Sequence, residues 1–344
     1  MTTDLTGGLP VEREYVLAER PEQDDIRDAV NVWLEEESGR FGMRIGIEAL
    51  SQEWDAHDIW LDIAFPDGRT LSRRGNGPTH SAIAADGKPR IRGAGPLRFE
   101  CVEPFKLWTV SFKGEAAEIT AEGLITNPAP EERVMRDIEF DIEMTMAVPP
   151  WVPGSLLTEA GAVLSGGEQG EFMSPRYEQL FRARGELRVG DERFSFKGQG
   201  LRIRRQGFRK FDGFWGHCWQ SCLFPSGKAF GFNIYPPRSD GKPNYAEGYI
   251  FEGDGTLVPA LPIDVPWLVK LRTGGDDVPL ELETVDGRRV HIEGTSFANL
   301  RSRGSVVLPP DFPIVQQAHV HYRWGDEEAT GMMERSSLPS KMEL

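Results

Sequence analysis

The stretch from Val134 to Val148 reads VMRDIEFDIEMTMAV and holds the longest alternation of apolar and polar residues in the chain. Its apolar side chains recur at every second position, namely Ile138, Phe140, Ile142, Met144 and Met146. Because successive side chains of a β-strand point to opposite faces of a sheet, this period predicts a strand with one buried face. Similar stretches recur roughly every 10–15 residues from residue 41 onward, a spacing typical of antiparallel barrels or sandwiches.

Turn residues separate these strand-like stretches. Glycine and proline number 38 and 25 of 344 residues, and Asp67-Gly68, Asp254-Gly255 and Asp286-Gly287 are hairpin signals. Helical periodicity is scarce outside residues 21–39, where apolar residues lie among charged ones and Gly39 can end a helix. The sequence therefore predicts an all-β protein with a short N-terminal helix.

The chain is long enough for two domains or one large one. We expect an N-terminal extension with its helix at 1–40, a first β domain at 41–200 and a second at 201–344. Residues 149–176 interrupt the strand pattern with prolines and glycines and predict a loop or lid within the first domain.

Charge and composition exclude several classes of partner. Lys and Arg total 39 against 54 Asp and Glu, a net charge of −15, which disfavours binding to nucleic acid or to anionic lipid. The N-terminal residues lack a signal peptide's pattern, no apolar run reaches membrane-spanning length, and three cysteines do not make a disulfide framework. These features predict a cytoplasmic protein without stable membrane insertion; a homodimer is compatible with the sequence.

The densest candidate site is residues 211–222, FDGFWGHCWQSC. On a strand, Trp215, His217 and Trp219 would share one face. A histidine between tryptophans is either a hydrogen-bonded core residue or the proton-transferring group of an apolar cavity, and we favour the cavity. Asp212 could be the accompanying acid.

Other patterns are weaker. His319 and His321 lie two residues apart and would need a third ligand to hold a metal, so we expect a polar interior or interface and no metal. The basic run of residues 201–210 could meet an acidic group of a ligand, but a solvated strand and turn is the favoured interpretation. Nucleophile-elbow, phosphate-loop and dinucleotide motifs do not occur, so no cofactor is predicted.

Several short motifs resemble the lipocalin-like superfamily of carotenoid 1,2-hydratases, with its bacterial AttH-type and fungal Diels–Alderase relatives. The similar stretches are Leu97–Pro104 with Leu107-Trp108, Tyr177–Gln179, Gly198–Arg202, Trp215–Trp219, Tyr322–Asp326 and Gly331–Glu334. The resemblance implies two lipocalin-like antiparallel β-barrel domains with a hydrophobic cavity near their junction.

The resemblance also implies residue roles. The hydratases depend on a His-x-Trp pair and a Tyr-x-Asp pair, whose acid protonates a double bond before water captures the cation. His217-Cys218-Trp219 matches the first pair, and Tyr245-Ala246-Glu247 matches the second with Glu in place of Asp. A carboxyl group buried among aromatic rings stays protonated more readily, which suits this chemistry.

We therefore expect a cofactor-independent enzyme, a lyase or an isomerase or cyclase, acting on a hydrophobic small molecule such as a terpenoid, steroid or polyketide-like compound. His217, Asp212 and Glu247 are the candidate catalytic residues. The candidate ligand-binding residues are Trp215, Trp219, Tyr245, His321 and Tyr322. A carrier of a hydrophobic ligand, which needs the cavity but no acid, is the alternative.

Overall fold

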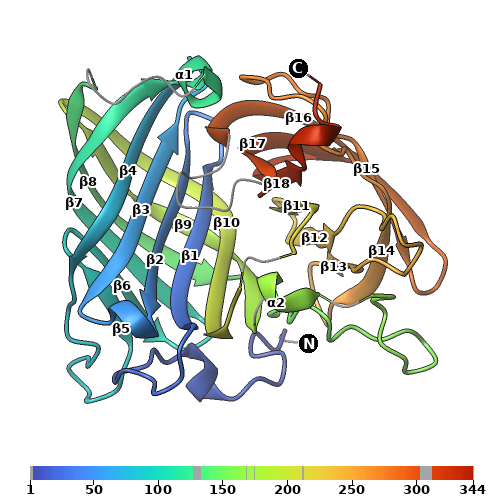
Figure 1. The fold of residues 1–344 in the computed structure, drawn as a ribbon, viewed down its shortest axis with the longest axis horizontal. Coiled ribbons are helices and arrows are strands. Elements are labelled where there is room, and N and C mark those ends of the chain that lie inside the picture. Colours follow the sequence, from blue (N-terminus) through green and yellow to red (C-terminus); the bar gives the residue numbers. More distant parts are fainter. Residues whose placement is uncertain are drawn as a thin grey trace.

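The computed structural model describes residues 3–126, 133–167, 169–173, 175–210, 213–302 and 312–343, and it is built almost entirely of β-strands. Figure 1 shows two β units side by side, one formed by the first half of the chain and one by the second. The all-β prediction is confirmed. Within these ranges, no helix is long and apolar enough to cross a membrane.

The first unit is a ten-stranded antiparallel sheet in the order β4-β3-β2-β1-β10-β9-β8-β7-β6-β5. Its strands are β1 (Ile26–Glu36), β2 (Gly42–Leu50), β3 (Ala56–Ala64), β4 (Arg69–Pro78), β5 (Ile91–Ala94), β6 (Leu97–Glu103), β7 (Leu107–Thr120), β8 (Met135–Met146), β9 (Arg176–Val189) and β10 (Glu192–Phe208). Strand β4 also pairs with β7, from Arg69 opposite Thr120 to Ser72 opposite Ala117. This pairing curls the sheet around a core that includes Phe140, Ile142 and Met144 of β8.

The second unit is a closed barrel of eight strands in sequence order. They are β11 (Gly216–Leu223), β12 (Lys228–Ile234), β13 (Ala246–Glu252), β14 (Val258–Asp264), β15 (Leu280–Thr284), β16 (Arg289–Ser302), β17 (Ile314–Trp324) and β18 (Glu327–Ser337). Its interior is filled by side chains that include Cys218, Phe230, Ile250 and Tyr322. Because side chains fill the barrel interior, a binding site is expected on the outer faces of the barrel.

The predicted helix at 21–39 is wrong, because Ile26–Glu36 is strand β1. Val30, Val32 and Leu34 face the core of the first sheet, whereas Trp33 packs with Trp219 between the two units. A strand buried on both faces carries apolar residues without a period of two, and it can therefore be mistaken for a helix.

The helices of the described residues are short. Helix α1 covers Ala121–Thr126 and α2 covers Gly170–Met173, and 3-10 turns cover Val11–Glu14, Ser51–Glu53 and Pro339–Lys341. Helix α2 belongs to the predicted loop at 149–176. That loop is tied down by a bridge between Trp151 and Glu178 of β9.

The two units meet along β1 and β10 on one side and β11 and β18 on the other. The last strand of the first sheet, β10, ends at Phe208, and the first strand of the barrel, β11, begins at Gly216. Trp33, Leu201, Ile203, Trp219 and Leu223 form an apolar cluster at this junction.

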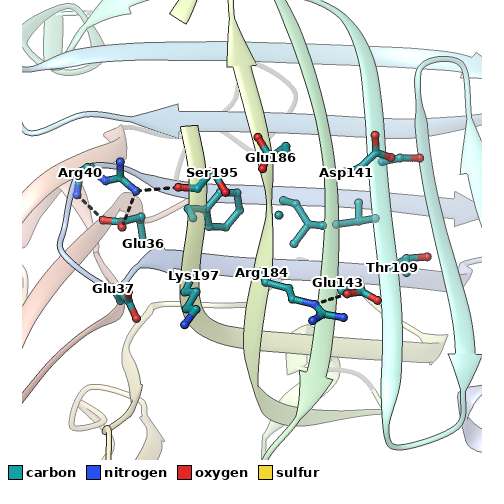
Figure 2. A pocket seen from close by; sticks show the side chains of 15 residues that line it. Glu36, Glu37, Arg40, Thr109, Asp141, Glu143, Arg184, Glu186, Ser195 and Lys197 are labelled. Atoms are coloured by element: carbon teal, nitrogen blue, oxygen red, sulfur yellow. Dashed lines mark hydrogen bonds and ion pairs between the residues drawn. The ribbon is translucent and has the colours of Figure 1, made fainter. Parts of the chain in front are cut away.

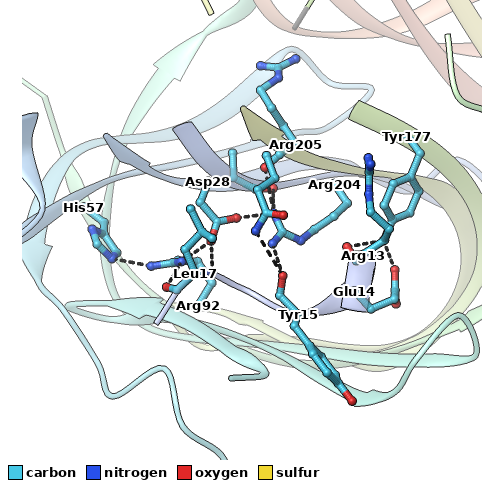
Figure 3. Close-up of polar contacts among 12 residues, drawn as sticks. Arg13, Glu14, Tyr15, Leu17, Asp28, His57, Arg92, Tyr177, Arg204 and Arg205 are labelled. Atoms are coloured by element: carbon cyan, nitrogen blue, oxygen red, sulfur yellow. Dashed lines mark hydrogen bonds and ion pairs between the residues drawn. The ribbon is translucent and has the colours of Figure 1, made fainter. Parts of the chain in front are cut away.

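Buried charges fill the end of the first unit's interior, where Figure 3 shows a network around Glu14 and Asp28. Asp28 forms ion pairs with Arg204 of β10 and Arg92 of β5. Arg92 Nη1 lies 2.9 Å from His57 Nε2, and burial together with the charge of Arg92 lowers the pKa of His57 to about 4.

Glu14 has a similar role beside this cluster. Its carboxylate lies 2.7 Å from Arg202 Nη2 and accepts a hydrogen bond of 2.6 Å from Trp108 Nε1. Burial alone would raise the pKa of Glu14, but Arg202 and the hydrogen bonds of Tyr177 and Trp108 hold it below its usual range. Glu14, from the segment before β1, and Asp28, from β1 itself, thus supply the carboxylates that neutralise Arg202, Arg204 and Arg92 inside the first sheet.

Candidate functional site

Strand β11 places His217 and Trp219 on the face that looks toward the first sheet, while Cys218 and Cys222 face the interior of the barrel. Trp215 does not share that face. It precedes β11, and Gly216 with φ +128° breaks the alternation between them. The Trp215 indole N–H donates to the carbonyl of Pro236 at 2.9 Å.

His217 and Trp219 line a cavity of about 110 Å³ at the junction of the two units. The other lining residues are Asn31, Trp33, Arg44, Glu48, Trp60, Phe172, Arg176, Ile203, Arg205, Arg209, Asn233 and Glu334. The location agrees with the expectation of a site near the domain junction. The expected apolar lining is wrong, because four arginines and two glutamates stand among the aromatic rings.

His217 is held at both ring nitrogens. Its Nε2 lies 3.0 Å from Glu334 Oε1 on β18. Its Nδ1 lies 2.7 Å from Ser336 Oγ, which also accepts a 3.0 Å hydrogen bond from the His217 backbone N–H. The register of the strands explains this geometry, since His217 pairs with Ser336 and Trp219 with Glu334.

Glu334 is an ionised carboxylate in this setting. Burial would raise its pKa, but the hydrogen bond and charge of His217, the charge of Arg44 and a hydrogen bond from Gln317 lower the pKa to about 2. Glu334 therefore cannot supply a proton at neutral pH, but it can orient His217 and stabilise positive charge on the imidazole ring.

Aromatic rings and guanidinium groups interleave around this pair. The Arg44 guanidinium carbon lies 5.6 Å from the ring centroid of Trp33 and 5.4 Å from that of Trp60. That of Arg176 lies 5.1 Å from the centroid of Trp219. The cavity therefore offers aromatic faces together with positive charge.

The structure gives Tyr245 and Glu247 other neighbours. Glu247 accepts hydrogen bonds from the backbone N–H groups of Gly154 and Leu156 and from the Tyr245 hydroxyl, the last two at 2.7 and 2.9 Å. Burial raises the pKa of Glu247 against these hydrogen bonds. Neither residue lines the junction cavity, and Glu247 anchors the loop of residues 149–176 to β13. Asp212 lies outside the described residues.

His321 and Tyr322 point in opposite directions on β17. The Tyr322 hydroxyl donates inside the barrel to Gln220 Oε1 at 2.5 Å. His321 is exposed and stacks on Phe297 at 4.2 Å between ring centroids. His319, buried at the junction, has Nδ1 2.9 Å from Glu35 Oε1. Thus His319 and His321 have separate partners, and Tyr322 belongs to the core.

A more open hollow of about 820 Å³ lies elsewhere and is shown in Figure 2. Val110, Ile142 and Phe196 at its floor belong to the core of the first sheet. Its polar lining residues are the outward-facing neighbours on the same strands, and they include Arg184 and Glu143, which pair with each other. It is an open depression on the outer surface, and its pairs of opposite charge leave no concentrated site.

Sequence reasoning missed Glu334, Arg176 and Arg205, and the favoured interpretation of residues 201–210 as solvated is wrong. Arg202, Arg204 and Arg205 are all at least 95% buried. A signal was present, because several arginines in one predicted strand put positive charge on both of its faces. The carboxylates that neutralise Arg202 and Arg204 lie more than 170 positions away in the chain, so no local pattern identifies them.

Comparison with solved structures finds the same fold at low sequence identity. An AttH candidate from Nitrosomonas europaea is 14% identical with a TM-score of 0.57, covering 91% of this chain and 92% of that chain. CghA in complex with Sch210972 is 11% identical with a TM-score of 0.57, covering 98% of both chains. Kievitone hydratase from Nectria haematococca is 11% identical with a TM-score of 0.53, covering 98% and 96%.

These matches show a likeness of fold to an AttH candidate and to a hydratase, the proteins whose superfamily the short motifs resemble. The search of curated proteins finds no match. A family model described as a domain of unknown function, DUF7064, matches residues 24–339, which include both β units. The chain therefore belongs to the DUF7064 family.

Proposed function

We propose that the protein is a cofactor-independent acid–base enzyme whose active site is the junction cavity. His217 is its proton-transferring residue and Glu334 the carboxylate that positions it. The observation that carries this proposal is the 3.0 Å contact between His217 Nε2 and Glu334 Oε1 inside a cavity walled by tryptophans. A carboxylate that orients an imidazole is a recurring arrangement in acid–base catalysis.

The surroundings suit a reaction that moves a proton to or from an unsaturated substrate. A substrate in the cavity lies beside the His217 imidazole, which transfers the proton while Glu334 holds its Nε2. Positive charge from Arg44 and Arg176 stabilises negative charge that develops on an oxygen as the proton leaves carbon. Hydration, dehydration or isomerisation of an unsaturated carbonyl compound meets these conditions. A kievitone hydratase with the same fold supports this reaction class by analogy.

The size of the cavity favours a compact substrate over a steroid or a large terpenoid. Pockets that enclose drug-sized ligands commonly span about 300–1,000 Å³, whereas this cavity measures about 110 Å³. A single ring with an unsaturated side chain fits such a volume better. Trp219 and Trp33 offer ring faces against which it can pack.

A carrier function is the second candidate, and one observation favours it. Both ring nitrogens of His217 already have hydrogen-bonding partners, as a structural histidine would. In a carrier, Glu334 and Ser336 would simply satisfy a buried imidazole. The two candidates differ in whether any product forms.

Turnover decides between them. A panel of single-ring α,β-unsaturated carbonyl compounds and their hydrated counterparts is incubated with the protein, and gain or loss of water is followed by mass spectrometry. For an accepted compound, His217→Ala should lower kcat/KM by roughly 10²–10⁴-fold. Glu334→Gln should lower kcat/KM because the carboxylate charge is lost. The loss should be smaller than for His217→Ala, since the side chain keeps its shape.

The matched control is His291→Ala, which removes an exposed histidine of β16. It should leave turnover unchanged. Equal turnover by wild type and His217→Ala would remove His217 from the mechanism. Binding without product across the panel would favour the carrier.

A further inference from the structure

Arg205 is a buried cation for which the described part of the chain provides no direct partner. It lies on β10 with 4% of its surface exposed, and its Nε is buried without a hydrogen-bond acceptor. Within the described ranges, its guanidinium group forms no hydrogen bond and no ion pair. Figure 3 shows its side chain pointing away from the network that holds Arg204.

The neighbour of Arg205 on the adjacent strand is a second arginine. Directly opposite on β9 lies Arg176, so that two like charges face each other across neighbouring strands. Such a pairing is destabilising unless something neutralises it. Arg176 Nη2 lies 2.5 Å from Glu178 Oε1, whereas the charges of Glu48 and Glu178 act on Arg205 without an ion pair or hydrogen bond to it.

Burial, with the charges of Arg209 and Arg176, pushes the pKa of Arg205 well below its usual value. A guanidinium group nevertheless remains protonated in proteins. Its charge therefore has to be balanced by a negative group entering the cavity, or it stands as a cost to the fold.

We propose that Arg205, with Arg176 beside it, is the binding site for the carboxylate of a small aromatic or unsaturated acid. The planar guanidinium fork binds carboxylates through two parallel hydrogen bonds. Trp33 and Trp219 line the same cavity and supply faces for the ring of such an acid. The proposal names the substrate class of the site proposed above and rests on that site, although its test requires no turnover.

The test uses two probes of nearly equal shape, benzoate and benzamide, titrated into the full-length protein by calorimetry. Benzoate should bind at least about tenfold more tightly than benzamide, because only benzoate forms charge-assisted hydrogen bonds. Benzoate should also raise the melting temperature more than benzamide at equal concentration. Equal behaviour of the two probes, or no benzoate binding at millimolar concentrations, overturns the proposal.

Variants locate the site. Arg205→Gln should weaken benzoate by about 10- to 100-fold and leave benzamide unchanged, and Arg205→Lys should retain part of the benzoate affinity. Arg184→Gln, in the outer hollow, is the matched control and should change neither. Unaltered benzoate binding by Arg205→Gln, or loss of binding in Arg184→Gln, would contradict the assignment.

The outcomes remain separable from the proposed function. If benzoate binds through Arg205 while the panel shows no product, the anion site stands and the enzyme proposal fails. If turnover depends on His217 but benzoate and benzamide bind alike, the enzyme proposal stands and the carboxylate site fails.

Discussion

The two faces of β10 treat buried arginine differently. On the face toward the core of the first sheet, Arg202 and Arg204 lie within ion-pair distance of Glu14 and Asp28. On the face toward the junction, Arg205 has no such carboxylate within the described residues. All three side chains are at least 95% buried, although Arg205 alone among them borders the junction cavity. The chain's own carboxylates neutralise the arginines of the core face, whereas Arg205 on the junction face needs an added anion as its partner.

The largest effect is expected when a carboxylate is removed from the core face, which tests whether these carboxylates neutralise the buried arginines. Asp28→Asn leaves Arg204 and Arg92 without their shared partner, and uncompensated buried charge is costly. We expect the free energy of unfolding to fall by about 3–5 kcal/mol, measured by urea denaturation. Asp141→Asn, at an exposed position of β8, is the control and should change it little. A loss below about 1 kcal/mol for Asp28→Asn would show that the core network contributes little.

A second experiment compares the same substitution, arginine to methionine, on the two faces of β10. Arg204→Met should lower the free energy of unfolding by about 3 kcal/mol, because Asp28 loses a partner. Arg205→Met removes a charge that has no direct partner and should leave stability unchanged or raise it by about 1 kcal/mol. The readout is the difference between the two variants in urea. Comparable losses would mean that Arg205 is neutralised as well as Arg204.

A third experiment, a pH series, concerns His57 at the edge of the core network. Its pKa is about 4 in the folded protein, against about 6.5 for an unfolded histidine. Between these values the unfolded chain binds a proton that the folded chain refuses, so stability should fall as pH drops from 6.5 toward 4. His57→Gln should flatten that part of the pH profile of the melting temperature. An equal slope in wild type and variant would contradict a neutral His57.

The sequence predicted those parts of the fold in which one face is buried. Residues 135–146 alternate and form β8, and the turn residues correctly favoured an all-β protein. Strand β1 was mistaken for a helix because Val32 faces the core while Trp33 faces the junction, so both faces are apolar or buried. Periodicity cannot reveal a strand whose second face is covered by another unit.

The candidate site was found only in part for a related reason. His217 and Trp219 lie close in sequence and share a face by simple alternation, whereas Trp215 is displaced by the positive φ of Gly216. Glu334 reaches His217 from 117 positions away through the pairing of β11 with β18. Such closure contacts are fixed by strand register, which local patterns do not contain.

The arginines of residues 201–210 are a further case in which the sequence does not show which charges are buried and neutralised. A run of basic residues is ordinarily solvated, and only tertiary structure shows that Arg204 is buried against Asp28 and Arg205 against Arg176. The arginine charges can be counted from the sequence, but only the fold shows which of them have a carboxylate partner.

A crystal structure with benzoate would test the central claim most directly. The account predicts the benzoate carboxylate in the junction cavity, with its oxygens about 2.7–2.9 Å from the guanidinium nitrogens of Arg205 and its ring against Trp33 or Trp219. Benzoate found only in the outer hollow beside Arg184, or a junction cavity in which Arg205 is already paired with a carboxylate of the chain, would contradict it.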